Sequence, residues 1–180
     1  MALTNWSGMP DVYSGNINPI HCFNDVVIDF YCVFDRTQED VDRVKYLREA
    51  ILNHTNTEAE WTEYQSDMKG ALNYSDLERI EKNLNTLANL FGLHLHSMAR
   101  DSIPRIPYFT NLWKNVKLIR ESPYHFYNTP KVPDMPLNTY QKINDIERIL
   151  WDAYIMFLNN EAAHYYAGNE ELYANNNIII

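Results

Sequence analysis

Apolar residues recur at three- and four-residue intervals along most of the chain, in segments that open with a helix-capping sequence. The first segment follows residues 37–40, where a Thr hydroxyl and a carboxylate three residues later are spaced to accept hydrogen bonds from free backbone N–H groups. Four apolar residues then share one helical face: Val41, Val44, Leu47 and Ile51. This pattern predicts an amphipathic helix beginning near residue 38.

Two further segments repeat the arrangement. Residues 57–60 form a second capping box, and Gly70 marks the expected end of that helix. Its apolar positions are Trp61, Tyr64 and Met68. Residues 75–78 form a third box, and Gly92 follows the last apolar position. The expected inner face of this third helix comprises Leu77, Ile80, Leu84 and Leu87.

Proline divides the second half of the chain. Pro104 and Pro107 precede a shorter predicted helix, with Thr110 as its candidate N-cap, and Pro123 follows it. The inner face of this helix should contain Leu112, Trp113, Val116 and Ile119. Residues 123–136 include four prolines, which favour extended backbone, so we expect a linker there.

The longest predicted helix follows the linker, begins at Asn138 or Thr139 and runs to about residue 158. Its inner face should comprise Ile143, Ile146, Leu150, Ala153 and Phe157, and its length would be roughly 30 Å. At the other end of the chain, residues 26–34 are rich in β-branched and aromatic residues. They predict a strand, although a buried helix remains open for so short an apolar run.

Together these segments predict a mainly α fold. We expect an antiparallel bundle of repeated capped helices, with a short N-terminal strand or extended arm. The expected regions are an acidic N-terminal arm or strand (1–35), a helical core (36–122), a Pro-rich linker (123–136), a long helix (137–160) and an acidic C-terminal tail (161–180). With only five glycines in 180 residues, turn-rich sheets and phosphate-binding loops are disfavoured.

Charge separates the chain ends from its middle. Residues 1–35 contain four Asp and residues 159–180 contain three Glu, and neither segment contains Lys or Arg, so the ends account for −7 of the net charge of −9. This charge argues against binding to nucleic acid, because phosphate backbones require clustered Lys and Arg. Two interpretations of the ends stay open: they are solvated, or they are arms that dock on a basic neighbouring subunit.

The sequence gives little indication of a membrane span, a secretory signal or a disulfide. No stretch approaches the roughly 20 apolar residues that cross a bilayer, so we expect no membrane insertion. The first residues lack the basic and then apolar pattern of a secretory signal, so we expect a soluble chain that starts near Met1. Cys22 and Cys32 are expected to be reduced, buried thiols.

A short motif recurs in three of the predicted helices. Residues 40–44 match residues 76–80 at an offset of 36 positions, and residues 140–147 form a weaker copy. Acidic residues in the first turn oppose the positive end of the helix dipole, and the arginine can pair with acids three or four positions away. We expect the motif to stabilise helices without performing chemistry.

This motif resembles a loose family of structural proteins of bacteriophages and prophages of Gram-positive hosts, in which short acidic-apolar-acidic-Arg-Ile-Glu helices recur. Residues 75–83 resemble them most, followed by residues 36–52 and 137–150. The resemblance implies a component of a phage or tailocin tail, at the baseplate, tail tip or fibre attachment. It also implies assembly in the host cytoplasm into a virion, with other tail proteins and copies of itself as partners.

Candidate catalytic chemistry is sparse. His94 and His96 form the one close histidine pair, and an i, i+2 pair chelates a metal from a strand but points to different sides of a helix. No glycine-flanked turn surrounds a Ser or Cys that would act as a nucleophile. We therefore expect no catalytic, cofactor-binding or metal-binding residues and no enzyme activity. The alternatives are a helical adaptor with a peptide groove and a small metalloenzyme centred on the two histidines.

Aromatic residues suggest where partners bind. The chain has 13 tyrosines, and tyrosine combines a large apolar area with a polar tip. The candidate interface residues are Trp113, Tyr124, Tyr127, Tyr165, Tyr166, Ile178, Ile179 and Ile180. Trp61, Trp113 and Trp151 are expected to pack in the core, with an interface role as the alternative. We expect a partner to bury the three terminal isoleucines.

Overall fold

A computed structural model describes residues 20–23, 26–98 and 104–175, and the side chains of residues 30–98 and 104–161. Five helices account for most of this part of the chain, which confirms the predicted mainly α class. The elements are β1 (Ile20–Phe23), β2 (Val26–Asp29), α1 (Gln38–Leu52), α2 (Glu58–Gln65), α3 (Tyr74–Phe91), α4 (Ile106–Glu121) and α5 (Tyr140–Asn175).

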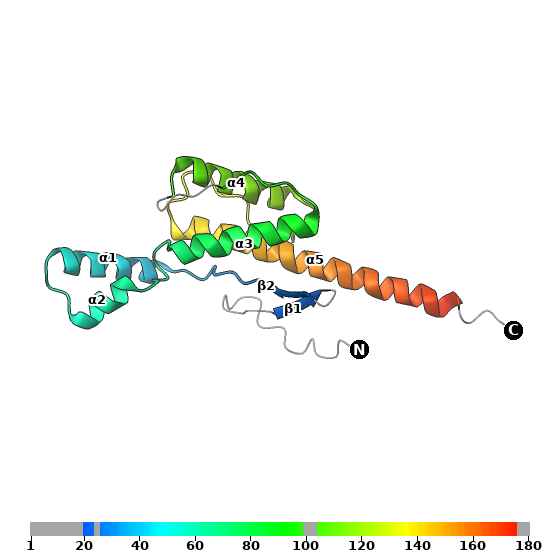
Figure 1. Ribbon diagram of the computed structural model, residues 1–180, viewed down its shortest axis with the longest axis horizontal. Coiled ribbons are helices and arrows are strands. Elements are labelled where there is room, and N and C mark those ends of the chain that lie inside the picture. The colour runs from blue at the N-terminus through cyan, green and yellow to red at the C-terminus, as the bar shows by residue number, and fades with distance from the viewer. Residues whose placement is uncertain (1–19, 24–25, 99–103, 176–180) are drawn as a thin grey trace.

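The core lies where α3, α4 and the first half of α5 pack against one another (Figure 1). The predicted inner positions Ile80, Leu112 and Leu150 are fully buried there. Helices α1 and α2 pack on each other and lie at one end of the molecule, near the start of α5 (Figure 1). The sequence spacing therefore identified most residues of the core helices that face inward. Trp113, expected on the inner face of α4, is only half-buried.

Two capping boxes form as predicted. The Thr37 hydroxyl accepts a hydrogen bond from the Asp40 N–H (3.2 Å), and the Asp40 carboxylate accepts one from the Thr37 N–H (2.7 Å). Thr57 and Glu60 make the same exchange at the start of α2. Burial opposes ionisation of Asp40, but the hydrogen bonds from Thr37 outweigh it and lower the pKa of this carboxyl.

The predicted third box is displaced by two residues. Asn73, not Ser75, is the N-cap of α3, and the Asp76 carboxylate accepts a hydrogen bond from the Asn73 N–H at 2.9 Å. Asparagine caps a helix as well as serine does, and Asp76 stands at the required third position after Asn73. The end of α3 is as expected, because Gly92 adopts the left-handed conformation at φ 65°.

Helix α4 begins five residues earlier than predicted. Its N-cap is Arg105, and the expected cap, Thr110, lies inside the helix and donates its hydroxyl hydrogen to the Ile106 carbonyl at 3.0 Å. Pro107 is accommodated in the first turn, where a backbone N–H has no helical acceptor to lose. The proline that we took as a boundary is therefore part of the helix.

Helix α2 is shorter than expected. It ends at Gln65, where the Ser66 hydroxyl donates to the Glu63 carbonyl at 2.7 Å. Trp61 is 42% exposed, so the expected core position for this residue is wrong. The physical reason is that α2 packs only on α1 among the described elements, and none of its residues is buried. Gly70 lies instead against the first turn of α1.

Helix α5 is much longer than predicted. It continues to Asn175, so most of the expected tail at 161–180 is helix, and its 36 residues span roughly 54 Å. Residues 159–175 contain no proline and several good helix formers, and the single Gly168 costs only about 1 kcal/mol. The far end of α5 extends past the other described elements (Figure 1).

The N-terminal strand is only partly as predicted. Residues 26–29 form β2, which pairs antiparallel with β1 so that Phe23 faces Val26 and Ile20 faces Asp29. From Phe30 onward the chain leaves the sheet and runs along α5, because Phe30 is buried against Tyr154 with ring centroids 4.2 Å apart. Packing on a helix therefore replaces strand pairing in residues 30–34.

The Pro-rich segment 123–136 has no helix or strand, and polar contacts hold it against the helices. The Thr129 hydroxyl donates to the Asp152 carboxylate at 2.7 Å, and the Trp113 indole N–H donates to the Pro133 carbonyl at 2.9 Å. The segment is therefore part of the packed structure rather than a spacer. Thr139, one of the two predicted caps, directly precedes α5, and its carbonyl accepts a hydrogen bond from the Ile143 N–H.

Burial on α3 gives a stability prediction. Ile80→Ala removes a fully buried side chain and should lower the free energy of unfolding by about 2–5 kcal/mol. Lys82→Ala, at an exposed position two residues later, should cost less than about 0.5 kcal/mol. Urea denaturation monitored by circular dichroism measures both changes. Equal losses would show that the helical phase of α3 is wrong.

Candidate functional site

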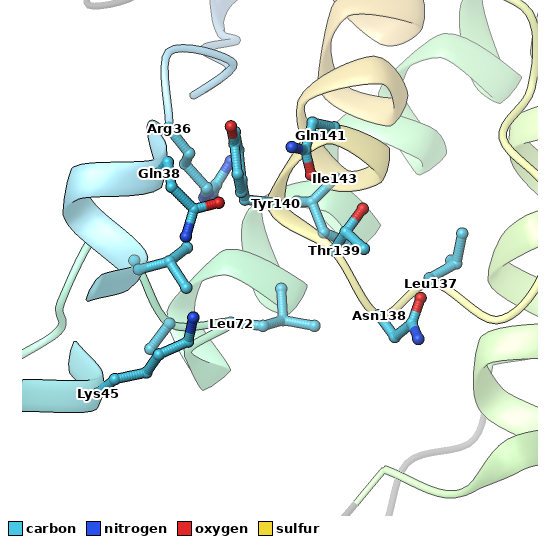
Figure 2. Close-up of a pocket in the computed structure, with 13 residues that line it drawn as sticks. Arg36, Gln38, Lys45, Leu72, Leu137, Asn138, Thr139, Tyr140, Gln141 and Ile143 are labelled. Carbon is cyan, nitrogen blue, oxygen red and sulfur yellow. The ribbon is translucent and has the colours of Figure 1, made fainter. Parts of the chain in front are cut away.

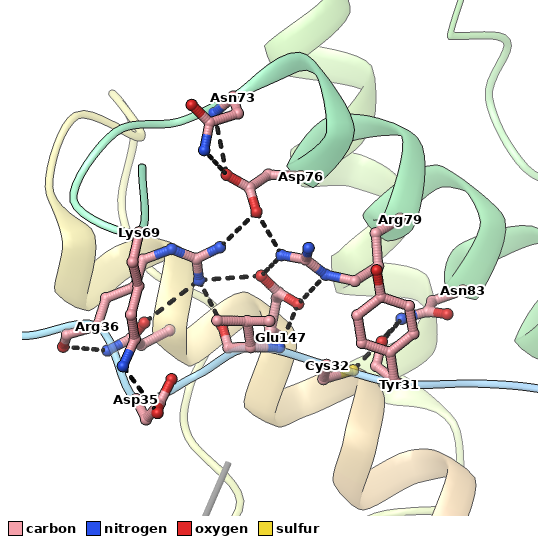
Figure 3. A network of polar contacts seen from close by, with 12 residues as sticks. Tyr31, Cys32, Asp35, Arg36, Lys69, Asn73, Asp76, Arg79, Asn83 and Glu147 are labelled. Atoms are coloured by element: carbon pink, nitrogen blue, oxygen red, sulfur yellow. Dashed lines mark hydrogen bonds and ion pairs between the residues drawn. The ribbon is translucent and has the colours of Figure 1, made fainter. Parts of the chain in front are cut away.

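A buried ionic cluster joins three distant parts of the chain (Figure 3). Arg36 precedes α1, Asp76 and Arg79 belong to α3, and Glu147 belongs to α5. Arg36 lies 2.9 Å from Asp76 and 3.0 Å from Glu147. Arg79 lies 2.6 Å from Asp76 and 2.7 Å from Glu147. Two positive and two negative charges thus balance in a site where each side chain is at most 8% exposed.

Backbone groups of residues 31–36 complete this ionic cluster. The Val33 N–H donates to the Glu147 carboxylate at 2.7 Å, and the Arg36 guanidinium donates to the Val33 carbonyl. The Asn144 amide donates to the Arg36 carbonyl at 2.9 Å. The Asn83 amide donates to the Tyr31 carbonyl at 2.7 Å. The segment between β2 and α1 is therefore fastened to both α3 and α5.

The electrostatics of the ionic cluster do not activate a nucleophile. Burial alone would lower the pKa of Arg79, but the hydrogen bonds and charges of Glu147 and Asp76 raise it above its ordinary value. The neighbouring Cys32 is buried and free, and burial, reinforced by the charge of Glu147, raises the pKa of its thiol. The thiol is therefore protonated near neutral pH, whereas a reactive cysteine requires a thiolate.

The ionic cluster is built to hold segments together. Both carboxylates accept hydrogen bonds from arginine, so their charges are neutralised within the cluster. Burying four charges is costly, and such pairs more often fix a specific arrangement than add net stability. The arrangement sets how the chain before α1, the start of α3 and the middle of α5 meet.

A groove of about 520 Å³ opens beside the ionic cluster, between α1, the loop before α3 and the start of α5 (Figure 2). Polar side chains along it include Gln38, Lys45 and Thr139. Leu72 and Ile143 contribute apolar surface to the same groove. Mixed walls of this kind suit one or two side chains of a bound peptide.

The histidine pair lies away from both the ionic cluster and the groove. His94 and His96 are exposed on the segment after α3, and the Asn115 amide bonds the backbone N–H and carbonyl of His96 at 2.8 and 2.9 Å. Among the described side chains, no three His, Cys, Asp or Glu residues are grouped as metal ligands. The metalloenzyme alternative gains no support from this region.

We therefore predict that changing both His94 and His96 to Ala leaves the melting temperature within a few degrees of the wild type. Exposed side chains contribute little to stability, and no metal is expected to supply folding energy. Thermal denaturation with and without a chelator tests this. A large drop in the variant, together with sensitivity of the wild type to the chelator, would contradict it.

The candidate interface residues do not form one described surface. Trp113 is half-buried, Tyr124 is half-buried and stacks on Phe91 at 4.5 Å, and Tyr127 is fully exposed. Tyr165 and Tyr166 lie on α5, but their side chains are outside the described part. Ile178, Ile179 and Ile180 also lie outside the described residues. Trp151 packs in the core as expected.

Sequence reasoning missed two members of the ionic cluster, Arg36 and Glu147. A signal for Glu147 was present, because it follows Ile143 by four positions and therefore falls on the predicted inner face of α5. A carboxylate on a buried helical face requires a positive partner. Arg36, the first basic residue of the chain, carried no comparable local signal.

Comparison with known proteins does not extend this description. No protein-family model, no curated protein and no solved structure matches the chain. In the part that the structure describes, no helix has both the length and the apolar character needed to cross a bilayer. The function is therefore inferred from the geometry and the sequence.

Proposed function

We propose that this protein is a structural subunit of a larger assembly, not an enzyme, and that it holds a neighbouring subunit through α5. The length of α5 carries this proposal. Figure 1 shows the far end of α5 extending past the other described elements, and the helix continues to Asn175. The C-terminal part of α5 therefore projects from the body formed by the other described helices.

A helical extension of this kind is best explained by a partner. Isolated helices of 12–15 residues or so are marginal in water, and tertiary packing supplies most helical stability. By sequence, residues 159–175 include Tyr165, Tyr166 and Tyr173, a residue type enriched at interfaces. No Lys or Arg follows Arg148, so the partner surface should be basic.

We further propose that the assembly is the tail of a phage or tailocin, at the baseplate, tail tip or fibre attachment. Support comes from the resemblance of residues 75–83 to tail structural proteins. In this chain Asp76 and Arg79 of that motif join the ionic cluster that positions α5. A subunit that presents a helix to its neighbours needs such a fixed orientation.

The groove supports a second candidate function, a peptide-binding adaptor. Its volume of about 520 Å³ and its mixed lining suit short peptide segments. An adaptor would remain functional as a monomer, and its peptide binding would depend on the groove. Leu72→Asp should then abolish peptide binding, while an assembly role through α5 would not change.

Truncation tests the assembly proposal. A chain that ends after Glu161 keeps every buried α5 residue described and should melt within a few degrees of the full chain. It should be lost from purified particles, which immunodetection after sedimentation measures. A second variant that lacks only residues 176–180 distinguishes the contribution of the terminal isoleucines from that of the helix. Incorporation at the normal level of the chain that ends after Glu161 would refute the proposal.

A further inference from the structure

We infer that the chain binds a second copy of itself, with the C-terminal part of α5 of one copy packed along the outer face of α4 of the next. This inference rests on the proposed assembly function and identifies the partner surface. Its evidence is the charge of the two segments, their lengths and their placement in the fold.

The outer face of α4 carries Lys114, Lys117 and Glu121, and the Lys117 ammonium lies 3.6 Å from the Glu121 carboxylate. The inner side of α4 is buried against α3 and α5, with Leu112, Val116 and Ile119 fully buried. Lys114 and Lys117 point away from that side by helical spacing, and both are exposed. In Figure 1, α4 runs along one edge of the molecule. The outer face is therefore available to a partner.

The basic character extends beyond these two lysines. Residues 104–133 contain five basic residues and one acidic residue, a net charge of +4 within a chain of net charge −9. The basic residues are Arg105, Lys114, Lys117, Arg120 and Lys131. Arg120 is half-buried and donates to the Pro130 and Thr129 carbonyls, so Lys114 and Lys117 supply most of the positive charge on the outer face. A segment of net positive charge on an acidic chain attracts the acidic part of another copy.

Apolar side chains accompany the lysines on this face of α4. Ile106 is 79% exposed at the start of the helix. Trp113 is half-buried against the core and donates to the Pro133 carbonyl, and the Lys117 ammonium lies 5.6 Å from the centre of its ring. A face that combines cations with an aliphatic and an aromatic side chain suits an amphipathic acidic helix. A binding partner that offered only negative charge would leave Ile106 in water.

The C-terminal part of α5 has the matching composition. Residues 159–175 contain Glu161, Glu170 and Glu171 and no Lys or Arg. Apolar and tyrosine residues recur there at spacings of three, four and seven positions, which is one helical face by sequence: Ala162, Tyr165, Tyr166, Leu172 and Tyr173. These 17 residues span roughly 25 Å, and the 16 residues of α4 span roughly 24 Å. The two helices can therefore pair along their whole lengths.

The contact must join different copies. Within one chain α5 is a continuous helix that meets α4 only through its first half, and its far end points away from α4 (Figure 1). Each copy thus offers one acidic helix and one basic face on different parts of its surface. Such a head-to-tail contact builds rings or open chains rather than a closed two-fold dimer.

Reciprocal charge reversal tests this pairing. Sedimentation velocity of the full chain should show species larger than the 21.3 kDa monomer at low ionic strength. These species should dissociate in about 1 M salt, where the Debye length falls to about 3 Å. The variants K114E/K117E and E170K/E171K should each self-associate about tenfold or more weakly than the wild type. An equimolar mixture of the two variants should associate again.

Controls make each outcome decisive. K45E/R48E reverses two exposed charges on α1 and should self-associate like the wild type, and circular dichroism shows whether each variant is folded. Monomeric wild type at all concentrations, or a mixture that fails to associate, would overturn the inference. The proposed assembly function would survive that result if the chain truncated after Glu161 is still lost from particles. Binding of the E170K/E171K chain to nucleic acid rather than to the K114E/K117E chain would also overturn it.

Discussion

Glu147→Gln is expected to lower the free energy of unfolding by about 3–5 kcal/mol. Glu147 is completely buried and accepts hydrogen bonds from Arg79 and from the Val33 N–H. Its ion pair with Arg36 measures 3.0 Å. Without its charge, two buried guanidinium groups share the single carboxylate of Asp76, and buried positive charge is left uncompensated. Urea denaturation at neutral pH measures the loss.

A matched control for this change is Glu63→Gln. Glu63 pairs with Arg43 at 2.6 Å, but both side chains are more than 40% exposed. Exposed ion pairs are screened by water and contribute little to stability. If the two Gln variants lose equal stability, the ionic cluster is not the joint between α3 and α5 that its geometry indicates.

Gly70→Ala is expected to displace the α1–α2 pair from its position beside the core. A Cβ at Gly70 would overlap the carbonyl of Asp40 and lie 2.6 Å from the Val41 nitrogen, and neither backbone group can rotate away. The two chain segments must separate, at a cost of about 1–3 kcal/mol or more. The Lys69–Asp35 ion pair of 2.8 Å would be disturbed by the same shift.

Hydrogen exchange locates the damage from Gly70→Ala. Amide protection should fall across residues 38–65 and remain in α3 and α4, because the atoms nearest to an added Cβ at Gly70 belong to α1. Gly92→Ala is the control, since no atom lies within 4 Å of an added Cβ there and only the strain of φ 65° remains. That strain costs about 1–2 kcal/mol. Uniform loss of protection across the chain would contradict the expectation.

Local sequence rules located most of the helices. Thr37 and Thr57 cap α1 and α2 as predicted, and the apolar spacing placed Ile80 and Leu84 inward, because both features depend on residues within a few positions of each other. The predicted end of α5 is wrong. The acidic composition of residues 161–180 suggests a tail, but their helix propensity allows the helix to continue. Acidic composition does not end a helix that contains no proline.

Local sequence rules could not predict the ionic cluster. Asp40 and Arg43 occupy the same positions in α1 as Asp76 and Arg79 occupy in α3, and each aspartate completes a capping box. Arg43 nevertheless pairs with exposed Glu63, whereas Arg79 pairs with buried Glu147, 68 positions away in the sequence. The same motif is therefore exposed in α1 and buried in α3, because different parts of the chain pack over the two helices.

The uninterrupted course of α5 has a mechanical consequence. A pull on its far end travels along the hydrogen-bonded backbone to Glu147, which is the point where α5 is bound to both arginines. The load then acts parallel to the α3–α5 contact, so the ion pairs and the packed side chains around Leu150 and Tyr154 resist it together. Contacts sheared in parallel withstand more force than contacts peeled apart one after another. A tensile load on this helix would therefore be shared by the whole core.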